Sequence, residues 1–261
     1  MSISFGEAHA QASGVSPVAD DAARVGEMIA SSIPQPSHEN GGFRQGARWW
    51  AMYVGAVFPL GTAAEDDGAK HPAGLLGRGW TAETVASRND ATILDWWTES
   101  PMSNVGIVTR ANGILILDVD PRHGGWESLH RLAAAAGIDF TTVPRSVSPR
   151  GDGGAHFWFR VPPRADGEPY PHSPVAPGLD RPWQVPVPPS MRLVTVDADS
   201  RDPSRVRDFR PYRWVAGDPR VLPEAPEVLL GAGMSIAAET SADGIGNVAP
   251  SPGGRLGKDA A

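Results

Sequence analysis

The sequence GILILDVD, residues 113–120, is a short apolar run that ends in two aspartates. It is rich in β-branched residues and opens on Asn112-Gly113, a turn signal, so it predicts a buried strand. Side chains alternate between the faces of a strand, which places Asp118 and Asp120 on the same face. Two carboxylates held so close repel unless a cation lies between them, and Mg²⁺ is commonly held by carboxylates and substrate phosphates. The stretch therefore predicts a divalent-cation site; a strand that ends in solvated acids is the alternative.

Composition limits the class of protein. The chain has 261 residues, of which 30 are glycine, 26 are proline and none is cysteine. This length allows one large or two small domains with a proper core. The lack of cysteine excludes disulfides and cysteine-based zinc sites and fits a cytoplasmic protein. The sequence has neither a long apolar span nor a secretory signal pattern, so we expect no membrane partner.

The net charge of −7 is unevenly distributed, because both ends of the chain are acidic and the middle is neutral. The acidic total therefore argues neither against nor for a nucleic-acid partner of the central part. Lys70 stands out, since the only other lysine among the 23 basic residues is Lys258. From composition we expect a flexible N-terminus at 1–18, one folded domain at 19–222 and a flexible acidic tail at 223–261.

Hydrophobic periodicity and turn signals predict helices that alternate with short strands. Helices are expected at 20–33, 43–53, 81–87, 90–98 and 125–137, and strands at 56–60, 104–108, 113–120, 155–161, 184–187, 193–196 and 212–214. Asn112-Gly113 is predicted to be a hairpin turn between the strands that flank it. Residues 201–213 are expected to be largely irregular, and Trp49, Trp50 and Tyr53 to belong to the core.

A second informative stretch is the glycine-rich turn SPRGDGG, residues 148–154, which leads into the predicted strand AHFWFRV. In this strand, alternation places His156 and Trp158 on one face and Phe157 and Phe159 on the other. A lone histidine on a strand is more often structural than functional.

Asp180 follows an apolar residue further along the chain and precedes Arg181-Pro182, a context more typical of a turn. Taken together, however, Asp118, Asp120 and Asp180 offer three carboxylates for two metal ions, and His156 offers a group for a phosphate.

In their chain order these features resemble the N-terminal catalytic domain of bifunctional DNA primase–polymerases, in the archaeo-eukaryotic primase superfamily. The resemblance covers roughly residues 45–215 and is specific because many motifs match in order. The matching segments are 50–60 with Val-Phe-Pro-Leu, 68–72 with Gly79-Trp80, 93–108 with Trp96-Trp97, Asp-x-Asp at 118–120 with Gly124-Gly125, 150–159 with Gly-Gly-x-His, Leu179-Asp180, and 188–190 with 212–214.

The resemblance implies metal-dependent, template-directed nucleotidyl transfer that makes or extends primers in the DNA replication of a mobile element. It implies two divalent ions, Mg²⁺ or Mn²⁺, held by Asp118, Asp120 and Asp180, and a contact of His156 with the incoming triphosphate. Further nucleotide contacts are expected from Lys70, Arg122, Arg150, Gly153 and Gly154. The implied partners are a single-stranded DNA template, (d)NTPs and a separate replicative helicase.

The fold that the resemblance implies is α+β, with an archaeo-eukaryotic primase-like core and an N-terminal α/β module. The core would have a central, mostly antiparallel sheet similar to the RNA-recognition fold, with helices on one side. Two departures occur: Gly154 stands where many members carry serine, and Arg181 to Val185 replaces the usual Gly-Gly strand. Two other functions remain open, a metal-dependent nuclease or phosphoesterase and a non-catalytic replication-initiation protein that binds DNA.

Overall fold

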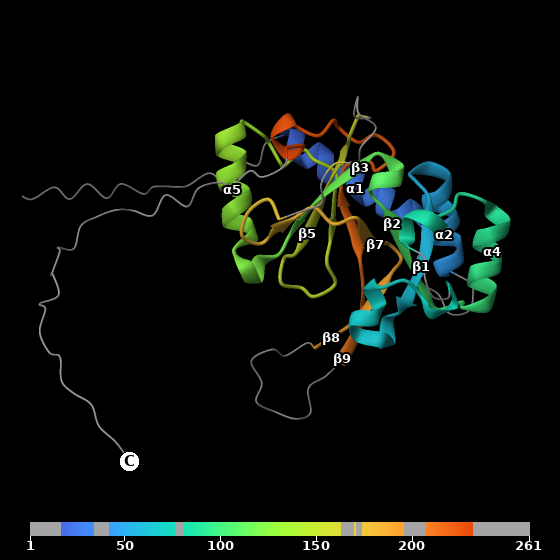
Figure 1. Cartoon of the computed structure of the whole chain (residues 1–261). Helices are drawn as coiled ribbons and strands as arrows, with labels where there is room; N and C mark the ends of the chain where they lie inside the picture. Colours follow the sequence, from blue (N-terminus) through green and yellow to red (C-terminus); the bar gives the residue numbers. More distant parts are fainter. Residues whose placement is uncertain are drawn as a thin grey trace, which may run out of the picture.

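The structure, a computed structural model, describes residues 17–33, 42–76, 81–162, 170, 174–195 and 207–231. A five-stranded and a three-stranded sheet form the body, and a two-stranded ribbon extends from it (Figure 1). All strand pairs are antiparallel, and helices accompany both large sheets, so the α+β class is confirmed. No helix in these ranges is long and apolar enough to cross a bilayer.

The elements follow the predicted periodicity closely. The helices are α1 (Pro17–Ser32), α2 (Gly42–Tyr53), α3 (Ala82–Val85), α4 (Asp90–Glu99) and α5 (Gly125–Ala136), with 3-10 turns η1 (Ala63–Lys70), η2 (Gly74–Leu76), η3 (Arg110–Asn112), η4 (Pro121–His123) and η5 (Glu227–Leu229). The strands are β1 (Val57–Thr62), β2 (Ser103–Val108), β3 (Ile114–Val119), β4 (Arg145–Val147), β5 (Ala155–Arg160), β6 (Leu179–Asp180), β7 (Gln184–Val187), β8 (Met191–Thr195), β9 (Arg207–Pro211) and β10 (Arg213–Ala216).

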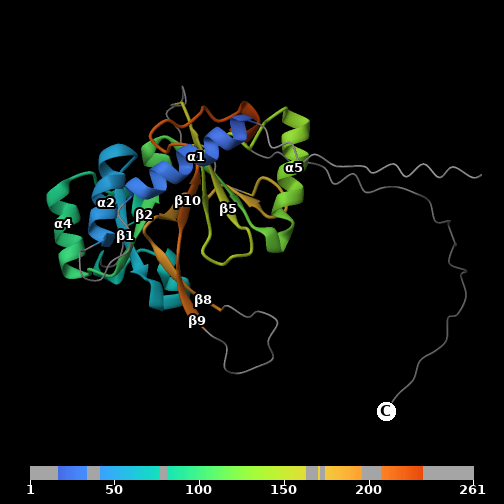
Figure 2. The ribbon, with the colours of Figure 1, turned by 180° about the vertical axis from the view of Figure 1, so that it is seen from behind.

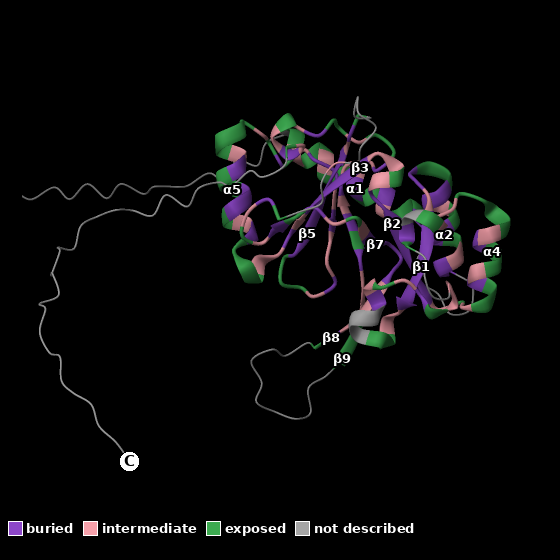
Figure 3. Cartoon of the chain, in the orientation of Figure 1, coloured by how far each residue is buried: buried purple, intermediate pink, exposed green. Residues whose placement is uncertain are grey.

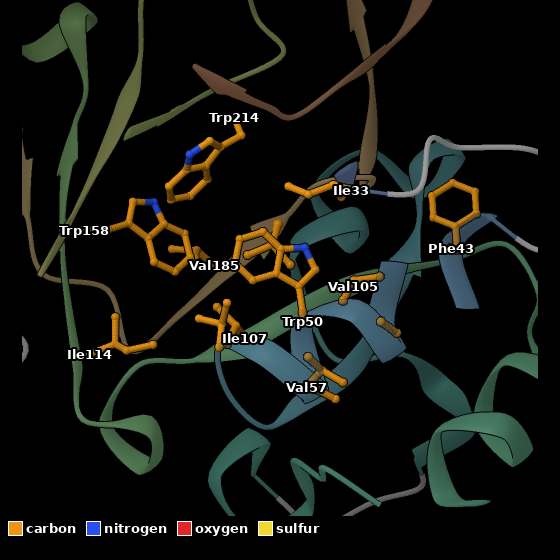
Figure 4. Close-up of a cluster of buried hydrophobic side chains, with 14 of the residues drawn as sticks. Ile33, Phe43, Trp50, Val57, Val105, Ile107, Ile114, Trp158, Val185 and Trp214 are labelled. Atoms are coloured by element: carbon orange, nitrogen blue, oxygen red, sulfur yellow. The ribbon is translucent and has the colours of Figure 1, made fainter. Parts of the chain in front are cut away.

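The three-stranded sheet has the order β1-β2-β7 and packs against α2 and α4. The aromatic face of α2 lies in the core that this sheet shares with the five-stranded sheet (Figure 4). Trp50 is fully buried and stacks on Trp158, with ring centroids 5.7 Å apart, while Trp214 lies 5.8 Å from Trp50. The prediction that these aromatics serve the core is confirmed for Trp50, whereas Tyr53 is about half exposed.

The five-stranded sheet has the order β10-β4-β5-β3-β6. One of its faces carries Trp158 and joins the core around Trp50. Its other face carries Phe157 and Phe159, which pack with Leu129 and Leu132 of α5 in a separate cluster. The predicted alternation along 155–161 is therefore confirmed. Figure 3 shows the central strands buried, and Figure 2 shows α1 lying along β10 on the back of the molecule.

The predicted hairpin at Asn112-Gly113 is wrong, because β2 and β3 belong to different sheets. Gly113, with φ +60°, ends η3 and lets the chain pass from one sheet to the other. The Asn112 side chain accepts a hydrogen bond from the Ala56 N–H at 2.7 Å and donates to the Val108 carbonyl at 2.7 Å. Asn112 therefore holds the start of β1 instead of closing a two-residue turn.

The three-stranded sheet lies beside the five-stranded one, and β7 joins it by pairing with β2 although it follows β6 in the chain. One further expectation differs from the structure. Part of the segment expected to be irregular forms the regular strand β9. The packed structure also continues past residue 222: Leu229 is fully buried, and the Ala225 N–H donates to the Arg160 carbonyl at 2.7 Å.

Candidate active site

A row of polar residues crosses the five-stranded sheet near the end of β3. The strand register pairs Ser146 with His156, His156 with Asp118, and Asp118 with Asp180. Directly opposed residues in antiparallel strands point to the same face with their Cβ atoms about 5 Å apart. Backbone register therefore brings together residues from β4, β5, β3 and β6 that are far apart in the sequence.

His156 is the buried member of this row. Its Nε2 lies 3.5 Å from Asp118 Oδ1, and its Nδ1 lies 3.5 Å from the Ser146 hydroxyl, which accepts a hydrogen bond from the Trp158 indole at 3.1 Å. The ring of Tyr212 stacks beside the imidazole, with centroids 6.3 Å apart. Burial lowers the pKa of His156, although the Asp118 charge opposes this. The imidazole is therefore neutral at physiological pH and oriented by three neighbours.

Asp118 and Asp180 form a pair of opposed carboxylates on adjacent strands. The pKa of Asp180 is raised, first by burial and then by the negative charges of Asp118 and Asp120. Such mutual repulsion disfavours the ionised form of each carboxyl unless a positive charge compensates it. The three predicted metal ligands are thus close enough to influence one another electrostatically.

Asp120 lies one residue beyond the end of β3 and caps η4, where its side chain accepts a hydrogen bond from the Arg122 N–H at 3.1 Å. The Arg122 guanidinium donates two hydrogen bonds to the same carboxylate, at 3.1 and 2.7 Å. His123 Nδ1 lies 3.2 Å from Asp120 Oδ2. These contacts, led by the Arg122 side chain, hold the pKa of Asp120 well below its usual range. Asp120 is firmly ionised and directed toward Arg122.

Close backbone packing fixes the position of Asp120. The Asp120 N–H donates to the Gly178 carbonyl at 2.8 Å, and the Gly125 N–H donates to the Asp120 carbonyl at 3.0 Å. A Cβ atom on Gly125 would lie 2.5 Å from the Gly178 carbonyl oxygen, so only glycine fits where the end of β3, the start of α5 and the approach to β6 meet.

A cavity of about 680 Å³ opens over the polar row and is lined by five of the nine predicted site residues: Lys70, Asp118, Arg150, His156 and Asp180. Asp120, Arg122, Gly153 and Gly154, although they are within the described ranges, lie outside its lining. The connection between β6 and β7 and residues of β2 and β7 also line the cavity, so it lies where the two sheets meet. A cavity of this size accommodates a nucleotide-sized ligand.

Lys70 lines the cavity from the end of η1, which packs beside β1 and β2 of the three-stranded sheet. Its backbone carbonyl accepts a hydrogen bond from Gln184 Nε2 at 3.1 Å, which links η1 to β7. The positive charge of Lys70 contributes to the lowered pKa of His156, so the ammonium group acts on the same part of the cavity as the imidazole.

The glycine-rich turn positions Arg150 at the cavity wall. Gly151 and Gly153 have φ values of +78° and +84°, a conformation that other residues rarely adopt. Arg150 Nε lies 2.9 Å from Asp152 Oδ2 in an ion pair without hydrogen-bond alignment, and Arg150 Nη2 lies 3.8 Å from Asp120 Oδ1. The Gly154 N–H already donates to Asp152 Oδ1 at 3.0 Å. Arg150 is thus placed for an anion, whereas the Gly154 amide is engaged within the turn.

Several cavity residues were not expected to act at a site. Tyr212 is buried, and burial raises the pKa of its hydroxyl to about 12. Trp183 is 47% exposed on the cavity rim. The Arg181 guanidinium is buried and donates to the carbonyls of Leu229 and Gly231 at 2.9 and 3.0 Å. No local sequence signal marks Arg181, because its partners lie about fifty residues away.

The residues present fit a divalent cation in charge and donor type, since opposed carboxylates are the oxygen ligands that Mg²⁺ and Mn²⁺ prefer. In the described part of the chain, however, no three acidic or histidine side chains converge closely enough to form a ready metal site. The second carboxylate of the Asp-x-Asp motif, on Asp120, is paired with the Arg122 guanidinium.

The family model for Prim-Pol, the N-terminal domain of bifunctional DNA primase/polymerases, matches residues 48–228. A search of curated proteins finds no match for the chain. The matched range contains both sheets, the cavity and the whole polar row.

Proposed function

The chain belongs to the bifunctional DNA primase/polymerase N-terminal family, and on this premise we propose that it catalyses metal-dependent, template-directed nucleotidyl transfer. In this proposal the protein would make or extend primers during replication of a mobile element, and a separate replicative helicase would be its partner. The observation that carries the proposal is the placement of Asp118, Asp180 and His156 on adjacent strands under one cavity with Lys70 and Arg150.

The carboxylates of Asp118 and Asp180, joined by Asp120, would hold Mg²⁺ or Mn²⁺. Bound there, the ions would supply charge neutralisation at the triphosphate and activation of the primer 3′-hydroxyl. Phosphoryl transfer depends mainly on positioning and charge stabilisation. Asp120 would join the ligand set while its hydrogen bonds to Arg122 orient it, because a carboxylate has lone pairs for both a metal ion and a donor.

The remaining residues would position the incoming nucleotide. His156 is neutral and can donate one ring N–H to a phosphate oxygen, while Ser146 and Tyr212 hold the ring in place. Lys70 and Arg150 flank the imidazole and would neutralise the other phosphate oxygens. The backbone amides of Gly153 and Gly154 would assist after rearrangement of the turn.

A primer-extension assay tests the proposal. Purified protein is incubated with a single-stranded template, with and without an annealed primer, and with labelled nucleotides and Mg²⁺ or Mn²⁺. Synthesis is expected from the wild type and from Asp95→Asn, an exposed aspartate on α4, but not from Asp120→Ala. Synthesis by Asp120→Ala would contradict the assignment. Primer shortening without nucleotides would identify a nuclease, and DNA binding without any turnover would identify a non-catalytic protein.

A further inference from the structure

The ribbon formed by β8 and β9 starts at the cavity and extends away from the body beside η1 (Figure 1). Tyr212, which lines the cavity, directly follows the last residue of β9. At the first residue of β8, the Met191 N–H donates to the Asn104 side chain at 2.8 Å, which connects β8 to β2. The ribbon is therefore anchored at the site and leads outward from it.

The two faces of the ribbon differ in chemistry. Arg192 is directly opposite Arg210, so both guanidinium side chains leave from the same face. Leu193 is opposite Phe209 on the other face, and Phe209 is 49% exposed. Asp208 lies on the arginine face too, 3.2 Å from Arg210.

The arginine face is continuous with the cavity. A Cβ atom on Gly151 would lie 3.3 Å from Arg210 Nη1, so Arg210 rests against the turn that places Arg150 in the cavity wall. Arg192 is opposite Arg210, which is two residues before Tyr212. The positive charges of Arg192 and Arg150 both act to lower the pKa of the Tyr212 hydroxyl, against the larger effect of burial. Three guanidinium groups thus border the path from the cavity along the ribbon.

We propose that Arg192 and Arg210 bind the phosphate backbone of the single-stranded template where it passes between the cavity and solvent. This inference rests on the proposed function and assigns the surface that holds its nucleic-acid partner. Arginine matches phosphate geometry through bidentate hydrogen bonds. Binding of this kind is independent of base sequence and sensitive to salt.

Fluorescence anisotropy with labelled oligo(dT), in EDTA and without nucleotide, measures this contact apart from catalysis. The double variant Arg192→Gln/Arg210→Gln is expected to bind about tenfold more weakly. Its plot of log affinity against log salt should be shallower by about 1.4, or about 0.7 for each phosphate contact on a single strand. Arg24→Gln/Arg131→Gln, which removes exposed arginines of α1 and α5, should bind within twofold of the wild type. Phe209→Ala, on the opposite face of the ribbon, should do the same.

The charge-retaining variant Arg192→Lys/Arg210→Lys separates phosphate binding from a folding defect, and it is expected to regain most of the affinity. Equal weakening in the lysine and glutamine variants would overturn the inference. Unchanged affinity and salt slope in the glutamine variant would also overturn it, as would absence of oligo(dT) binding by the wild type. If poly-glutamate displaced the DNA as efficiently as unlabelled oligo(dT), the inference would be overturned in favour of an acidic protein partner.

Primer extension with the same preparations distinguishes this inference from the proposed function. Wild-type synthesis with normal DNA binding by Arg192→Gln/Arg210→Gln would retain the function and reject the ribbon contact. Arginine-dependent DNA binding by a wild type that synthesises nothing would retain the ribbon contact and reject the function.

Discussion

The two faces of the strand pair β3–β5 carry different kinds of residue on the same backbone. The face toward α5 is apolar along its whole length, with Leu117, Phe157 and Phe159 fully buried. The other face is apolar in its middle, where Trp158 and Ile116 enter the core, and becomes polar two residues along, at His156 and Asp118. The face toward α5 stabilises the two strands, and the polar end of the other face carries the candidate site residues His156 and Asp118.

The difference between the faces shows what holds the site in place. Apolar burial contributes roughly 25 cal/mol for each Å² removed from water, so the α5 face favours folding. The opposed carboxylates of Asp118 and Asp180 repel each other, as the raised pKa of Asp180 indicates. The site therefore depends on strand register that is stabilised elsewhere, and changes on the two faces should have different consequences.

The largest effect is expected from Asp118→Asn on the polar face. On the proposed function, primer extension should fall at least about a thousandfold, equivalent to about 4 kcal/mol in the barrier, because an essential negative charge is lost. The melting temperature should stay within a few degrees of the wild type or rise, since the substitution also removes a repulsive charge. Steady-state extension rates and thermal melting check this. Wild-type activity in this variant would remove the functional distinction between the faces.

Leu117→Ala, one residue away on the apolar face, should lower stability and leave activity largely unchanged, the reverse of Asp118→Asn. Truncation of a fully buried leucine typically costs 2–5 kcal/mol of folding free energy, from lost transfer energy and the cavity left behind. Chemical denaturation should report this loss, while extension activity is largely kept at temperatures where the variant remains folded. A stable but inactive Leu117→Ala protein would show that the two faces are not separable.

His156→Gln should change the pH dependence of stability. Burial lowers the pKa of His156 in the folded protein, so below about pH 6.5 the unfolded chain binds the proton more readily and folding stability falls as pH falls. One such group contributes a slope of at most about 1.4 kcal/mol per pH unit. Denaturation curves at pH 5 to 7 should show a smaller slope in His156→Gln. An equal slope in the two proteins would mean that His156 is not a buried neutral group.

The smallest effect on stability is expected from Asp180→Asn. Because the pKa of Asp180 is raised on folding, its ionised form opposes folding, and the wild type gains stability as pH falls through that raised pKa. Asn removes the repulsion with Asp118 and should stabilise the protein by about 0.2–1 kcal/mol at neutral pH. Thermal melting at pH 4 and pH 7 measures the difference between the proteins. Destabilisation at pH 7 would indicate that Asp180 already has a favourable partner.

Much of this comparison follows from local sequence pattern. The period-2 alternation in 155–161 predicts which residues face α5, and the run GILILDVD predicts β3 to within one residue at either end. The family resemblance is confirmed over 48–228, and the register places His156 and Asp180, two of the features that carried it, beside Asp118. The metal and nucleotide roles of these residues stay predictions.

Other features could not be read from local pattern. Gly113 was predicted to close a hairpin because Asn-Gly favours tight turns, but Asn112 instead bonds to the start of β1. The ion pair between Asp120 and Arg122 was likewise not expected, since β3 ends at Val119 and the Arg122 side chain folds back onto the carboxylate. In both cases a specific side-chain hydrogen bond adds what a statistical preference does not contain.

Local pattern was enough to indicate the helices, most of the strands, the faces of β5 and the family, because periodicity and motif order are properties of neighbouring residues. Local pattern does not indicate that β7 joins the first sheet, that Asp180 lies opposite Asp118, or that the arginines of β8 and β9 share a face beside the cavity. These are matters of register between distant segments. Register is set by the packing of the whole chain, and no single stretch of sequence contains it.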